Sequence, residues 1–87
     1  MKTKAEIKIA GFRLIESTAR AMMNVFNGCR ADKAIVDANM ARLPKMVEWF
    51  KANDLMPELK YYMTSGDWNT SGIRFHMAKL YEIVMNF

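Results

Sequence analysis

The chain has 87 residues, of which 52% are hydrophobic and 25% are charged, and its formal net charge is +4. This composition excludes a disordered chain, because enough apolar surface is present to offset chain entropy, and it predicts one small domain over residues 1–87. A membrane span and a secretory signal are not expected either, because charged residues interrupt every apolar run, and the lone Cys29 cannot form an intrachain disulfide, so we expect a cytoplasmic protein.

The first segment predicts a long helix over roughly residues 4–27. Thr3 and Glu6 have the spacing of a capping box, in which each side chain bonds the backbone amide of the other's position. Apolar residues then recur at helical spacing, and Gly28 supplies a residue suited to ending the helix. Residues 4–9 also alternate between apolar and charged side chains, which is typical of a strand. The capping box favours the helix.

The middle of the chain predicts a second helix from Asp32, as N-cap, to about Asn53. Apolar residues repeat at steps of three and four, but Pro44 interrupts them. Because a proline inside a helix removes a hydrogen bond, we expect a kink or break at Leu43. Asp54 can cap a short third helix that tolerates Pro57 in its first turn. This helix ends near Gly66.

The last segment predicts a polar loop over residues 65–72, followed by an amphipathic helix from about residue 71 to the C-terminus. The expected fold is therefore all-α, a compact bundle of three to four helices. The alternative is an α+β fold with a short N-terminal strand and a hairpin around residues 60–77.

Catalytic and metal-binding machinery is not expected. One histidine, His76, and one cysteine, Cys29, are too few for a metal site or for a nucleophile–base pair with an orienting third group. No glycine-rich phosphate loop is present, and the acidic residues have basic neighbours. The sequence thus predicts a protein that is not an enzyme and takes no cofactor or small-molecule substrate.

The net charge lies in the first third of the chain. Residues 1–30 hold six basic and two acidic residues, whereas residues 31–87 hold seven of each. A basic helix can attract nucleic acid by its phosphates. The alternative function is therefore nucleic-acid binding through the cations of this segment: Lys4, Lys8, Arg13, Arg20 and Arg30. An ordinary solvated helix face explains the same charges more simply.

Aromatic residues favour a protein-binding module. The adjacent pairs at residues 49–50 and 61–62 each place one ring off the main apolar stripe, and exposed aromatic side chains are enriched at interfaces. Nine methionines also suggest adaptable apolar surface. The expected contact residues are Trp49, Tyr61, Trp68, Arg74 and Phe75.

The expected function is that of a small accessory regulator or inhibitor that docks on a larger protein or complex, or that self-associates. Small proteins of this character are common in phages and mobile elements, where inhibiting a host defence system such as CRISPR is one known task. No motif in this chain points to that particular role.

Overall fold

The computed structural model describes residues 2–65, 68 and 72–87 and is all-α, as predicted. Its elements are α1 (Lys4–Phe26), a short 3-10 helix η1 (Arg30–Asp32), α2 (Lys33–Ala52), α3 (Met56–Ser65) and α4 (Ile73–Met85). The strand expected as an alternative for residues 4–9 is therefore wrong, since these residues are helical. Residues 60–65 and 73–77 are helical as well, which excludes the hairpin; residues 66–67 and 69–71 of that segment lie outside the described residues.

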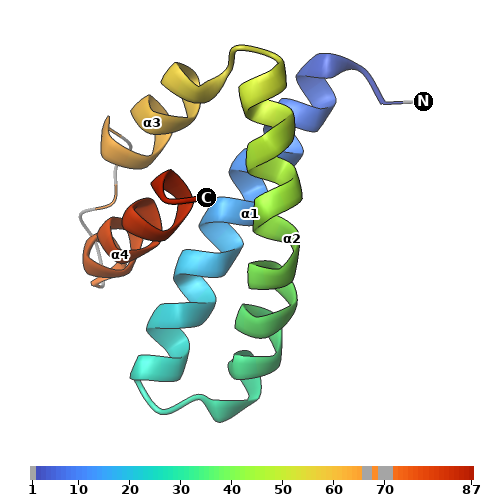
Figure 1. Cartoon of the computed structure of the whole chain (residues 1–87). Helices are drawn as coiled ribbons and strands as arrows, with labels where there is room; N and C mark the ends of the chain where they lie inside the picture. Colours follow the sequence, from blue (N-terminus) through green and yellow to red (C-terminus); the bar gives the residue numbers. More distant parts are fainter. Residues whose placement is uncertain (1, 66–67, 69–71) are drawn as a thin grey trace.

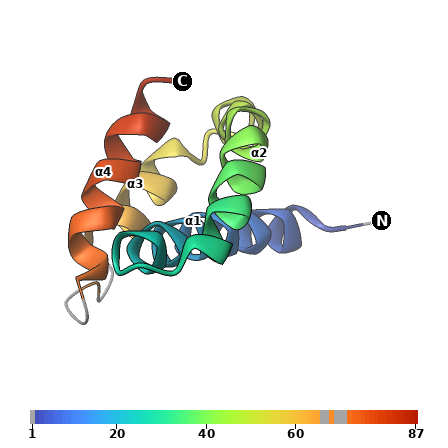
Figure 2. The same cartoon turned by 90° about the horizontal axis from the view of Figure 1, so that it is seen from below.

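Helices α1 and α2 form an antiparallel hairpin, and α3 and α4 pack on one side of it (Figure 1; Figure 2). The predicted capping box starts α1: the Thr3 hydroxyl accepts from the Glu6 amide at 3.2 Å, and the Glu6 carboxylate accepts from the Thr3 amide at 3.3 Å. Gly28 follows the helix with φ +102°, a conformation that side chains rarely tolerate. These two local signals explain both ends of α1.

Two predictions about α2 need correction. The helix continues through Pro44 to Ala52, so the break expected at Leu43 is wrong. Pro44 is exposed, and Leu43 and Val47 on the buried face hold the helix against its neighbours. Asp32 precedes α2 but does not cap it with its side chain. Its carboxylate instead accepts from Asn24 Nδ2 at 2.8 Å, which ties the turn to the end of α1.

The start of α3 also differs from the prediction. The helix begins at Met56, one residue later than capping by Asp54 requires, and Asp54 lies in a turn with φ 56°. Leu55, which follows it, is buried and donates its amide to the carbonyl of Phe50 at 2.9 Å. The turn is therefore set by the burial of Leu55. Pro57 stands in the first turn of α3, as expected.

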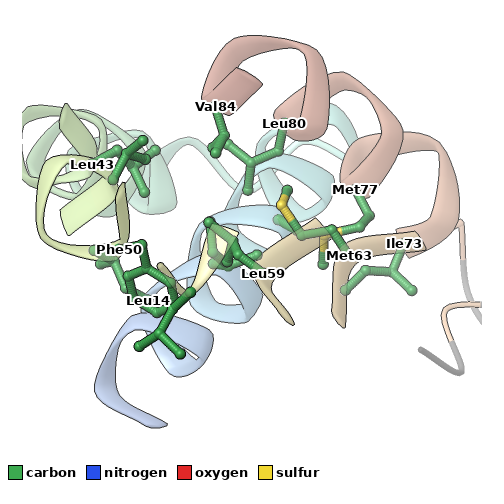
Figure 3. Packing of buried hydrophobic residues seen from close by; sticks show 13 residues of the cluster. Leu14, Leu43, Phe50, Leu59, Met63, Ile73, Met77, Leu80 and Val84 are labelled. Atoms are coloured by element: carbon green, nitrogen blue, oxygen red, sulfur yellow. The ribbon is translucent and has the colours of Figure 1, made fainter. Parts of the chain in front are cut away.

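A single apolar core joins the four helices. The side chains labelled in Figure 3 converge from all of them, and Phe50, Leu59 and Leu80 are fully buried. Towards the open end of the hairpin, α1 and α2 approach closely over Gly11. A Cβ atom on Gly11 would lie 2.5 Å from the ring of Phe50, so only glycine fits the observed packing. This contact fixes the spacing of the two long helices.

Candidate functional site

The five predicted contact residues do not share one surface. Tyr61 on α3 is 67% exposed and Phe75 on α4 is 55% exposed, whereas Trp49 and Trp68 are half-buried and pack against the core. Arg74 and Trp68 line one hollow between α3 and α4. The sequence thus identified two strongly exposed rings among the five, on different helices.

Trp68 has a structural role in this arrangement. Its Nε1 donates to the carbonyl of Tyr62 at 3.0 Å, and its ring meets the Tyr62 ring edge-on at 5.3 Å between centroids. Both the polar and the apolar parts of Trp68 are therefore engaged within the chain. A partner that used this side chain would have to displace these contacts.

The aromatic residues of α1 and α4 come together around His76. The ring of His76 lies 5.5 Å from that of Phe26 and 5.2 Å from that of Phe75, in edge-on geometry with both. Lys79 Nζ lies 4.9 Å from the centroid of the Phe75 ring, a cation–π contact. We call these four residues (Phe26, Phe75, His76 and Lys79) the His76 cluster. It presents two strongly exposed phenylalanines, because Phe26 is 74% exposed.

His76 itself is buried, with only 6% of its surface exposed. Burial lowers its pKa below the usual value, and the nearby Lys79 ammonium lowers the pKa further. The neutral ring is therefore favoured at neutral pH. This environment keeps charge out of the centre of the cluster.

A second aromatic surface lies where α1 meets α3. The rings of Phe12 and Tyr62 stack at 4.4 Å with an angle of 4° between their planes. Tyr62 donates its hydroxyl to Glu16 at 3.5 Å, and burial together with the Glu16 carboxylate raises the pKa of Tyr62. Tyr61 and Pro57 line the same hollow. Because Phe12 and Tyr62 pack against the core, Tyr61 is the strongly exposed ring of this surface.

The cations predicted to bind nucleic acid are also dispersed. Lys8 pairs with Glu58 at 2.9 Å and Arg20 pairs with Glu16 at 2.8 Å, so two of the five are partly neutralised. Lys4 is in the first turn of α1, and Arg30 is in η1 at the opposite end of the hairpin. Arg13 is exposed on α1 and lines two hollows beside α2.

Two arginines and a lysine do meet along the outer seam of the hairpin. Arg13 of α1 and Arg42 of α2 line one hollow, and Lys45 joins Arg42 in the next. Arg42 and Lys45 were not among the predicted residues. The net charge of residues 31–87 is zero and gave no sign of these two cations, although no acidic side chain pairs with either of them in the described residues. Their spacing of three on an exposed helix face was the signal available in the sequence.

The two residues considered for nucleophilic chemistry, Cys29 and His76, have different neighbours in the structure. Cys29 Sγ is exposed and lies 3.6 Å from the Asp32 carboxylate, whereas His76 lies among phenylalanine rings, and no hydrogen bond joins the two. Within the same residues, no group of three or more potential ligands could hold a metal ion.

No family model, curated protein or solved structure matches the chain. No helix among the described residues is both long enough and apolar enough to cross a membrane.

Proposed function

We propose that this protein is a non-enzymatic protein-binding module that uses the His76 cluster as a contact surface. The observation that carries the proposal is the pair of exposed rings, with Phe26 at 74% and Phe75 at 55% exposure, that both contact the buried His76 edge-on. The two rings come from the end of α1 and the start of α4. The fold therefore assembles a surface that neither helix provides alone.

Physical reasons favour a protein as the partner of this surface. Exposed phenylalanines lose unfavourable contact with water when a partner covers them, and clustered aromatic residues are typical of interface centres. Lys79 adds an exposed ammonium group at the edge, where its contact with water can persist. An accessory regulator or inhibitor that docks on a larger complex is one form of this proposal, including an inhibitor of a defence system such as CRISPR. Self-association is another form.

The proposal can be tested by affinity capture from a lysate of the native host, with and without nuclease. The protein is compared with a Phe26→Ala/Phe75→Ala variant and with Tyr61→Ala, which removes an exposed ring from the other aromatic surface. We expect a protein partner that survives nuclease treatment and is retained by Tyr61→Ala. Its recovery by the double variant should fall by about tenfold or more, as for loss of an interface hot spot.

Two outcomes would contradict the proposal. Equal recovery of the partner by the double variant would show that the His76 cluster is not the contact surface. Loss of capture after nuclease treatment, with gel retardation of nucleic acid that weakens steeply as salt rises, would favour the nucleic-acid alternative instead. Sedimentation of the purified protein over a range of concentrations identifies self-association, which the same double variant should abolish.

A further inference from the structure

A groove runs along the outer seam of the α1–α2 hairpin, on the side that α3 and α4 leave uncovered. Three hollows make it up. The central one shares Arg13 and Ser17 with the hollow on one side, and it shares Arg42 with the hollow on the other. We call this continuous feature the hairpin groove. Because α1 has 23 residues and α2 has 20, it can extend for about 30 Å.

The residues that line the hairpin groove repeat every seven positions. Ile35, Arg42 and Trp49 follow this spacing on α2, and Arg13 and Arg20 follow it on α1. Residues seven apart lie on the same side of a helix, two turns along, which is the spacing that packed helices use to meet a partner helix. The side chains on each wall of the groove therefore have the spacing that a third helix, lying along the groove, could contact with its own seven-residue repeat.

The charge of the hairpin groove is predominantly positive. Five cations line it (Lys2, Arg13, Arg20, Arg42 and Lys45), against three carboxylates. The carboxylates already have partners within the chain: Glu6 in the capping box, Glu16 on Arg20 and Asp32 on Asn24. No ion pair among the described residues involves Arg13, Arg42 or Lys45. Together with Lys2 at the end of the groove, which forms no ion pair among the described residues either, these three cations are left to meet an acidic partner.

Apolar side chains lie between these cations. Ile9 and Ile35 are 46% and 44% exposed, and Met46 and Trp49 are half-buried along the same seam. A nucleic-acid backbone offers no apolar surface to cover them, whereas an amphipathic helix does. A second copy of this chain carries the same charge of +4 and is a poor match in charge.

We infer that the hairpin groove binds an acidic amphipathic helix of a partner protein. Apolar residues on one face of that helix would cover Ile9, Ile35 and Trp49, while flanking carboxylates meet Arg13 and Arg42. The inference rests on the proposed function in that the partner is a protein. It concerns a different surface from the His76 cluster, so the two can fail separately.

The test measures binding of a fluorescent 20-residue helical peptide that carries leucine on one face and glutamate on its flanks. Matched probes replace every glutamate by lysine, or replace the peptide by a 20-nucleotide single strand or a 20-base-pair duplex. We expect the glutamate peptide to bind most tightly and to perturb the backbone NMR signals of residues 9–20 and 35–49. Arg13→Gln/Arg42→Gln should weaken it by about tenfold.

The matched control is Arg30→Gln/Lys60→Gln, which removes the same two charges from exposed positions outside the groove. It should leave binding within about twofold, because neither side chain lines the groove and exposed charges outside a contact contribute little. Phe26→Ala/Phe75→Ala should also leave peptide binding unchanged, which separates this result from the test of the His76 cluster. Far-ultraviolet circular dichroism checks that each variant is folded.

Four results would overturn the inference: no binding of the glutamate peptide, equal weakening by both charge variants, NMR changes centred on the His76 cluster, or tighter binding of either nucleic acid. The last would assign the groove to nucleic acid. Equal weakening would show a general effect of net charge.

Discussion

At the scale of a single residue, Gly11 decides how closely the two long helices approach. Glycine normally weakens a helix by about 1 kcal/mol relative to alanine, because its unfolded backbone has more freedom. Here the ring of Phe50 occupies the space that a Cβ atom would need, with its Cε1 and Cζ atoms only 2.5 and 2.8 Å from that position. The packing requirement therefore opposes the helix propensity at this site.

Gly11→Ala should destabilise the protein by about 1–3 kcal/mol, because overpacking outweighs the gain in helix propensity. Urea denaturation measures the free energy of unfolding. Phe50→Leu is the matched background, since it shortens the ring that causes the clash, and there the cost of Gly11→Ala should shrink markedly. A stabilising effect of Gly11→Ala in the native background would show that the helices are not in contact at this position.

His76 makes stability depend on pH in a direction fixed by its lowered pKa. The unfolded chain takes up a proton near the ordinary value of about 6.5, whereas the folded state resists it. Neutral His76 contributes its full stabilisation of the fold above about pH 6.5. This contribution decreases as the pH falls from the pKa of the unfolded state to the lower pKa of the folded state. It does not decrease further below the pKa of the folded state.

The pKa of His76 can be followed directly by NMR, because it is the only histidine in the chain. Lys79→Gln should move this pKa upward, since the ammonium lowers it, but burial should keep it below the usual value. Urea denaturation of His76→Asn isolates the effect on stability from that of the carboxylates. If this variant lost stability between pH 7 and 5.5 as steeply as the unaltered protein, His76 would not be the group responsible.

At the scale of the element, Pro44 lies within α2 at a cost to that helix. A proline has no amide hydrogen, so the carbonyl four residues earlier, on Met40, loses its helical donor. Pro44 is exposed and contributes nothing to the core. Pro44→Ala should therefore raise the free energy of unfolding by about 1–2 kcal/mol, somewhat less than the full helix penalty because proline also restricts the unfolded chain.

Pro57 provides the matched control for this substitution. It is exposed and stands in the first turn of α3, where the amide has no helical acceptor in any case. Thermal unfolding of both variants makes the comparison, and Pro57→Ala should be neutral or slightly destabilising. Equal stabilisation by both substitutions would mean that neither effect comes from the interior of a helix.

The difference between local and tertiary effects explains which elements could be predicted from the sequence. The start and end of α1 depend on local chemistry at Thr3, Glu6 and Gly28, so local reasoning identified them. The continuity of α2 depends on Leu43 and Val47, whose burial outweighs the local effect of Pro44. Tertiary contacts of this kind cannot be read from the neighbouring residues alone.

At the scale of the whole molecule, the candidate surfaces are products of tertiary structure. Phe26 and His76 are far apart in the sequence, and only the crossing of α4 over α1 brings their rings together. The sequence predicted Phe75 as a contact residue but could not indicate its neighbours. Likewise, Arg13 and Arg42 come from segments with different net charge, and the hairpin joins them.

Buried and exposed phenylalanines should differ clearly in their effects on the free energy of unfolding. Phe50 is fully buried at the centre of the core, and Phe50→Ala should cost about 3–5 kcal/mol, enough to threaten a domain of this size. Phe26→Ala/Phe75→Ala removes rings that water already reaches, and should change the free energy of unfolding by less than about 1 kcal/mol. Chemical denaturation of the two variants makes the comparison. A core-like cost for the double variant would show that these rings stabilise the fold, and the proposal of a protein-binding surface would lose the observation on which it rests.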